Sequence, residues 1–96
     1  MTITNKNDAN KATVLARLSA VRSALENGPQ TPAVARALEQ CVRLEQAITQ
    51  FHAEGLRFAA FTLFRMVASQ STFFTQPVHT ATQELKSALE TAGYPH

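Results

Sequence analysis

The chain has 96 residues, a length typical of one small domain, and 45% of them are hydrophobic, enough to bury a core without disulfides or metals. Its net charge of +2 is too small to indicate nucleic-acid binding by itself and excludes acidic mimicry of DNA. The single cysteine cannot form an internal bridge, no apolar signal segment opens the chain, and no stretch is apolar enough to span a membrane. We therefore expect a cytoplasmic protein.

The N-terminal segment, residues 1–7, is polar and shows no periodic pattern, so it is predicted to be a flexible arm, followed by a single helical domain over 8–96. The first helix is expected over residues 9–26, with Asp8 or Asn10 as its N-cap. Its apolar residues recur every three or four positions, as on the buried side of a helix. They are Val14, Leu18, Val21 and Leu25.

A second helix is predicted from Pro32, because Thr31 is a good N-cap and the first turn accepts proline. Gly55 leaves two interpretations open: it ends this helix, or it lies inside one long, mildly kinked helix that reaches about Ser69. The apolar pattern keeps its register on both sides of Gly55 and favours the long helix. The residues that carry this pattern are Val34, Leu38, Cys41, Leu44, Ile48, Phe51, Ala59, Leu63 and Met66.

The C-terminal part is predicted to begin with a loop over 69–76, held in place by Phe73 and Phe74. A last helix follows from Pro77, and Gly93 ends it. No segment alternates with period two, so strands are not expected. The predicted fold class is all-α: a small antiparallel bundle of three or four helices, built from a helical hairpin with a long second helix and a C-terminal helix.

The phenylalanines are concentrated in one part of the sequence, since all six fall between positions 51 and 74. The segment 56–67 holds three of them at helical spacing and is too apolar for the one-sided face of a surface helix. Either the other helices cover this segment within the monomer, or part of it contacts a second chain, a copy of the protein or a different one. Aromatic residues and arginine are enriched in interface cores, so the second interpretation predicts a set of partner-binding residues. They are Leu56, Arg57, Phe58, Phe61, Phe64 and Arg65.

Motifs for catalysis, metal binding or cofactor binding are absent from the sequence, so we predict a protein that is not an enzyme and needs no cofactor. His52 follows Glu45 by seven residues, about 10 Å along a helix, which is too far for a direct hydrogen bond. Cys41 lies on the apolar stripe and is predicted to be a small buried hydrophobe.

The predicted function is a non-enzymatic protein–protein interaction module: an adaptor, a small chaperone or a self-associating bundle. The layout resembles, in architecture but not in any motif, small bacterial helical chaperones and adaptors that hold a partner helix. The alternative is a nucleic-acid-binding protein, in which four arginines share one outer face of the long helix and Phe61 stacks on a base. These arginines are Arg36, Arg43, Arg57 and Arg65.

Overall fold

The computed structural model describes residues 6–50 and 52–94. Four α-helices make up most of this part of the chain, and a short 3₁₀ turn, η1, precedes the last of them. The elements are α1 (Lys6–Asn27), α2 (Pro32–Gln50), α3 (Ala53–Ser69), η1 (Ser71–Phe73) and α4 (Gln76–Ala92).

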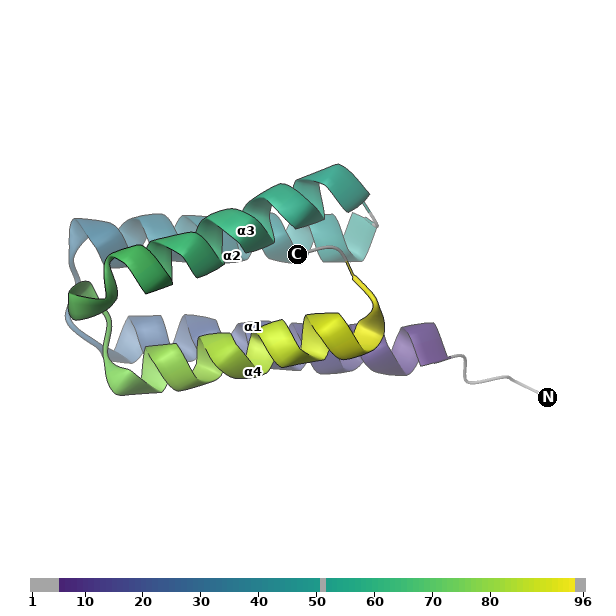
Figure 1. The fold of residues 1–96 in the computed structure, drawn as a ribbon, viewed down its shortest axis with the longest axis horizontal. Coiled ribbons are helices and arrows are strands. Elements are labelled where there is room, and N and C mark those ends of the chain that lie inside the picture. The colour runs from purple at the N-terminus through teal and green to yellow at the C-terminus, as the bar shows by residue number, and fades with distance from the viewer. Residues whose placement is uncertain (1–5, 51, 95–96) are drawn as a thin grey trace.

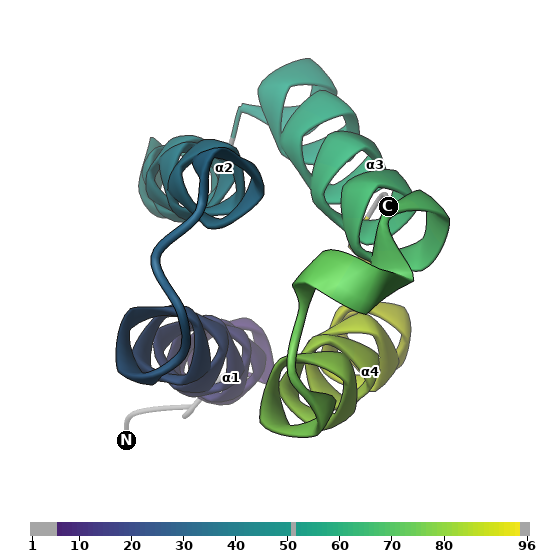
Figure 2. The same ribbon diagram turned by 90° about the vertical axis from the view of Figure 1, so that its left-hand side faces the viewer.

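The four helices run alternately up and down and form an elongated antiparallel bundle of 48 × 23 × 17 Å (Figure 1). Viewed along the bundle, α1 lies beside α4 and α2 lies beside α3 (Figure 2), and these are the two pairs that pack most closely. No strand occurs among the described residues. The predicted all-α fold class, a small antiparallel helical bundle, is confirmed.

The core is built from one apolar stripe on each helix, as the spacing of the apolar residues predicted. The predicted stripe of the first helix is buried, with each side chain at most 1% exposed: Val14, Leu18, Val21 and Leu25. α2 and α3 bury small side chains as well, which allow two helix backbones to approach closely. These are Ala33, Ala37, Ala47, Ala59 and Ala60.

The start of α1 differs from the sequence prediction. The helix already includes Lys6 and Asn7, which were assigned to the flexible arm, while residues 1–5 lie outside the described part. Asp8 and Asn10 lie within the helix, so neither is its N-cap. The helix starts well before Val14, the first residue of the apolar stripe, in a segment where periodicity gives no signal; lysine and alanine, both good helix formers, occur in this segment.

The prediction of one long second helix was wrong. α2 ends at Gln50, α3 begins at Ala53, and the two form a hairpin. A continuous helix over 32–69 would be about 57 Å long, longer than the whole bundle at 48 Å. The apolar residues keep the same periodic pattern on both sides of the turn because each helix buries its own stripe in the same core. Phe51, the last residue of the predicted α2 stripe, lies outside the described residues.

His52, not Gly55, forms the junction between the two helices. Its backbone N–H donates to the carbonyl of Ala47 at 2.9 Å and closes α2, while its carbonyl accepts from the N–H of Leu56 at 2.8 Å and opens α3. Its side chain caps α3, because Nδ1 accepts from the N–H of Gly55 at 2.9 Å. This bond satisfies one of the backbone donors that a helix start leaves without a partner.

This cap leads to a prediction. His52→Ala should lower the free energy of unfolding by about 1 kcal/mol, because the N–H of Gly55 loses its acceptor. Gly55→Ala adds a Cβ only 2.7 Å from Nδ1 of His52 and displaces the cap. Alanine at position 55 also stabilises the helix by about 1 kcal/mol relative to glycine. The loss of the cap and the gain in helix propensity therefore cancel in Gly55→Ala. His52→Ala should therefore cost nothing further in the Gly55→Ala protein. Urea denaturation of all four proteins measures this coupling, and additive effects would contradict it.

The C-terminal half follows the sequence prediction with one exception. α4 begins after Thr75 and ends at Gly93, which adopts the left-handed conformation with φ of 74°. The N–H of Tyr94 bonds the carbonyl of Leu89 at 2.9 Å, as in a Schellman motif. The exception is the preceding loop: Phe74 is buried at 6% exposure, but Phe73 is 56% exposed, so only one of the two phenylalanines holds it.

Candidate functional site

The side chains capable of acid–base or metal chemistry are dispersed over the bundle. Glu45 pairs with Arg22 of α1 at 3.2 Å, and His52 caps α3, so these two residues act separately. His79 Nε2 lies 3.1 Å from the carbonyl oxygen of Ser71 and ties η1 to α4. Among the side chains that the structure describes, those of residues 10–50 and 52–94, no three His, Cys, Asp or Glu gather closely enough to hold a metal ion.

Cys41 is fully buried, as predicted. Burial raises the pKa of its thiol to about 12; the positive charge of Arg22 opposes this rise, and the negative charges of Glu26 and Glu45 add to it. A neutral thiol in this position packs as a hydrophobic side chain and is a poor nucleophile.

The raised pKa predicts a specific dependence of stability on pH. Below the ordinary thiol pKa of 9.0, both the folded and the unfolded protein keep the Cys41 proton, and the contribution to stability is fully present. Between 9.0 and about 12 only the unfolded state loses the proton. Stability should then fall by about 1.4 kcal/mol per pH unit. Urea denaturation of the wild type and Cys41→Ala in both ranges tests this, and equal slopes in the two proteins would contradict it.

The predicted partner-binding residues divide into a buried set and an exposed set. Leu56 is only 3% exposed and belongs to the core, and Phe64 is half-buried against it. Phe58 is 64% exposed and Phe61 is 52% exposed, as expected for the side of α3 opposite its buried stripe. Arg57 and Arg65 are exposed beside them.

Four exposed residues of α3 form one continuous surface, which we call the outer face of α3. It consists of Glu54, Phe58, Phe61 and Arg65, at the spacing that brings helical residues onto one side. The guanidinium of Arg65 lies 5.8 Å from the centre of the Phe61 ring, a cation–π contact. A hollow of about 360 Å³ opens on this face, lined by Glu54, Arg57, Phe58 and Phe61.

A second hollow, of about 450 Å³, adjoins the outer face of α3 on the side of α4. Phe61, Phe64 and Arg65 line it from α3, and Lys86 and Glu90 line it from α4. The surface around Phe61 is therefore apolar at its centre and has basic and acidic groups at its edge, the usual composition of a protein interface.

The arginine surface proposed for nucleic acid lacks its structural basis, because the long helix that would carry all four arginines is not formed. Arg36 and Arg43 lie on α2, while Arg57 and Arg65 lie on α3, which runs in the opposite direction. Arg43 also pairs with Glu39, four residues before it on α2, at 3.5 Å.

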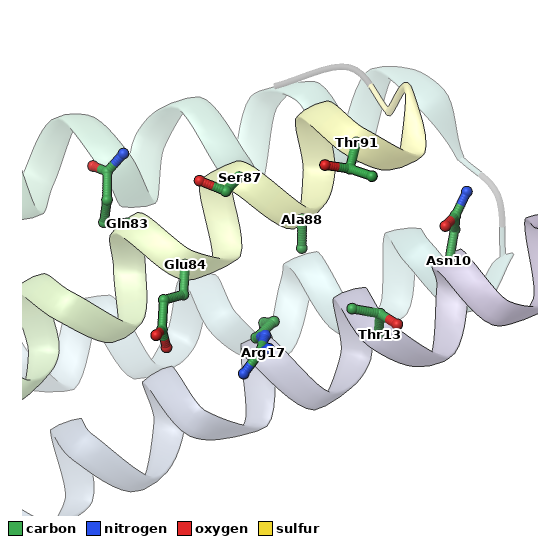
Figure 3. A pocket seen from close by; sticks show the side chains of 8 residues that line it. All are labelled: Asn10, Thr13, Arg17, Gln83, Glu84, Ser87, Ala88 and Thr91. Atoms are coloured by element: carbon green, nitrogen blue, oxygen red, sulfur yellow. The ribbon is translucent and has the colours of Figure 1, made fainter.

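Two of the other hollows lie away from the outer face of α3. One, of about 310 Å³, follows the groove between α1 and α4, where Glu84 and Ala88 point from α4 toward α1 (Figure 3). Its lining residues are of ordinary surface types, polar except for one alanine: Asn10, Thr13, Arg17, Gln83, Glu84, Ser87, Ala88 and Thr91. The other, of about 270 Å³, lies at the end of the bundle between Phe73 and Pro32.

No protein-family model matches the chain, and neither the curated proteins nor the solved structures include a significantly similar one. In the part of the chain that the structure describes, no helix combines the length and the apolar character needed to cross a membrane.

Proposed function

We propose that this protein is a non-enzymatic helical interaction module that binds another protein chain through the outer face of α3. One observation carries the proposal: Phe58 and Phe61, three residues apart on one helix, are 64% and 52% exposed. Burying such a side chain contributes about 1.5–3 kcal/mol. Two adjacent exposed phenylalanines therefore favour a bound state in which they are covered.

The charges around this pair favour a protein partner over a membrane or a nucleic acid. A helix that lies on a membrane surface has a polar side rich in lysine, whereas this face has Glu54 at one end and Arg65 at the other. Nucleic-acid affinity grows with the number of basic groups that contact phosphates, and here two arginines, Arg57 and Arg65, accompany one carboxylate. Mixed charge at the edge of an aromatic centre is what a protein interface requires.

A photo-crosslinking amino acid placed at position 61 tests the proposal directly. Benzoylphenylalanine keeps the aromatic ring of phenylalanine and adds a photoreactive benzoyl group. It replaces Phe61 in cells that produce the protein, and the adducts are mapped by mass spectrometry. We expect a covalent adduct with a protein chain from position 61 and from position 58. Phe73 is the matched control, because it is 56% exposed but lies on η1. Yields at 58 and 61 that do not exceed the yield at 73 would overturn the proposal.

A further inference from the structure

We propose that the partner is a second copy of this chain, bound by antiparallel pairing of the two α3 helices in a register that places Phe58 opposite Phe61 and Glu54 opposite Arg65. This inference rests on the proposed function, since it names the occupant of the same face. It is carried by the order of residues along that face, by the shape of the hollow on it and by its charges.

The first observation is the spacing. Glu54, Phe58, Phe61 and Arg65 are separated by four, three and four residues, the alternation with which two helices interlock as a coiled coil. All four are exposed, and they lie opposite the buried stripe of α3. A second helix can therefore pair along this face without displacing any core residue. The pairing extends over most of α3.

The second observation is that the face is complementary to its own reverse. Along α3 the order is acidic, aromatic, aromatic, basic. A two-fold axis through the midpoint of the face, between Ala59 and Ala60, reverses this order in the second copy. Glu54 then faces Arg65 of the second copy, and Phe58 faces its Phe61. Because a two-fold interface uses the same surface twice, each of these contacts forms twice.

The third observation is the hollow of about 360 Å³ on the face. Its lining residues, Glu54, Arg57, Phe58 and Phe61, have the spacing i, i+3, i+4 and i+7. Four residues at this spacing form the hole that receives one side chain of a partner helix in knobs-into-holes packing. In the proposed register the side chain that enters this hole is Phe61 of the second copy. The residues that line the hollow and the order of charges along the face thus both fit the same register of the two helices.

The neighbouring charges are compatible with this pairing. In an antiparallel pair the same side of each helix meets across the interface, so Arg57 lies opposite Phe64 of the second copy and directly faces no charged residue. Lys86 and Glu90, which line the adjacent hollow from α4, carry opposite charges and leave no net charge at the edge. Arg65, positioned over Phe61 at 5.8 Å, lies where the carboxylate of Glu54 from the second copy would arrive. One helix pair is a small interface, so we expect a dissociation constant on the order of 10 μM.

A charge-exchange experiment tests both the partner and the register. Sedimentation velocity over a concentration series should show the wild type in monomer–dimer equilibrium. E54R and R65E alone place two pairs of like charges in each dimer and should each weaken dimerisation about tenfold at low salt. An equimolar mixture of E54R and R65E should regain the wild-type affinity, because both pairs in the mixed dimer are opposite in sign. The double variant E54R/R65E should regain it as well.

The mixture also controls for folding, because it contains the same two variants that are weak when alone. Within one helix, positions 54 and 65 are about 16 Å apart, so their direct interaction does not explain a rescue. A wild type that stays monomeric well above the expected dissociation constant would overturn this inference. A mixture no stronger than its components would do the same. The proposed function is tested separately: it fails if the crosslink yield at position 61 does not exceed the yield at the control position 73. A crosslink to a different protein, without a dimer of this chain, would support the proposed function and overturn this inference.

Discussion

Phe58→Ala/Phe61→Ala is expected to weaken association at least about a hundredfold while the fold stays intact. Buried aromatic anchors typically contribute 2 kcal/mol or more each to an interface, so two together account for a loss of this size. In the isolated chain both side chains are exposed at 64% and 52%, so their truncation removes little core packing. Alanine is also the better helix former. The free energy of unfolding should change by less than about 1 kcal/mol, including the lost cation–π contact with Arg65.

Two measurements on the same samples check this result: sedimentation for association and urea denaturation for stability. Phe73→Ala is the control, because it removes an equally exposed phenylalanine at 56% from another surface and should leave association unchanged. An unfolded double variant would show that these side chains support the monomer core. Equal loss of association in the control would show that general surface hydrophobicity, and not the outer face of α3, causes self-association.

Leu63→Ala should have the opposite profile, with a large loss of stability. Leu63 lies on the buried side of α3 and is 0% exposed. Removing a buried leucine side chain costs 2–5 kcal/mol, because apolar contacts are lost and a cavity remains. This is a large fraction of the 5–15 kcal/mol typical of a small domain. The midpoint of urea denaturation, followed by circular dichroism, should fall sharply.

The comparison within one helix makes this prediction specific. Phe58→Ala removes more atoms from the same helix, yet from its exposed side, and should shift the midpoint only slightly. If the two variants were equally destabilised, the assignment of the buried and exposed sides of α3 would be wrong. Because Leu63 does not lie on the outer face of α3, Leu63→Ala should weaken association only to the extent that it unfolds the protein.

The sequence was sufficient to predict the fold class and most helix limits, because these depend on local chemistry. Thr31 caps α2 through a bond to the N–H of Val34 at 3.1 Å, and Gly93 ends α4 in the conformation that glycine prefers. The break between α2 and α3 was mispredicted because His52, which is not a typical capping residue, forms it. Periodicity does not detect a turn after which the apolar residues remain in phase.

The candidate site was predicted in part. The placement of Phe61 with the arginines on the outer face of the predicted long helix correctly indicated an exposed phenylalanine, but the apolar run also suggested Leu56, which the bundle buries. Glu54 was not among the predicted site residues, and its symmetric relation to Arg65 becomes evident once α3 is a separate helix. Lys86 and Glu90 required the structure, because only the fold brings α4 to the edge of the site.

The two closest helix pairs of the bundle differ in how far apart their helices lie in the sequence, and this difference affects how the protein folds during synthesis. α2 and α3 are adjacent in sequence, so their hairpin can form early through local contacts. α1 packs most extensively on α4, which the ribosome releases after the other three helices. Until α4 has been synthesised, the apolar stripe of α1 is only partly covered and remains partly exposed to water. A nascent chain arrested before Gln76 should therefore be the species most in need of a chaperone, and completion of α4 should release it.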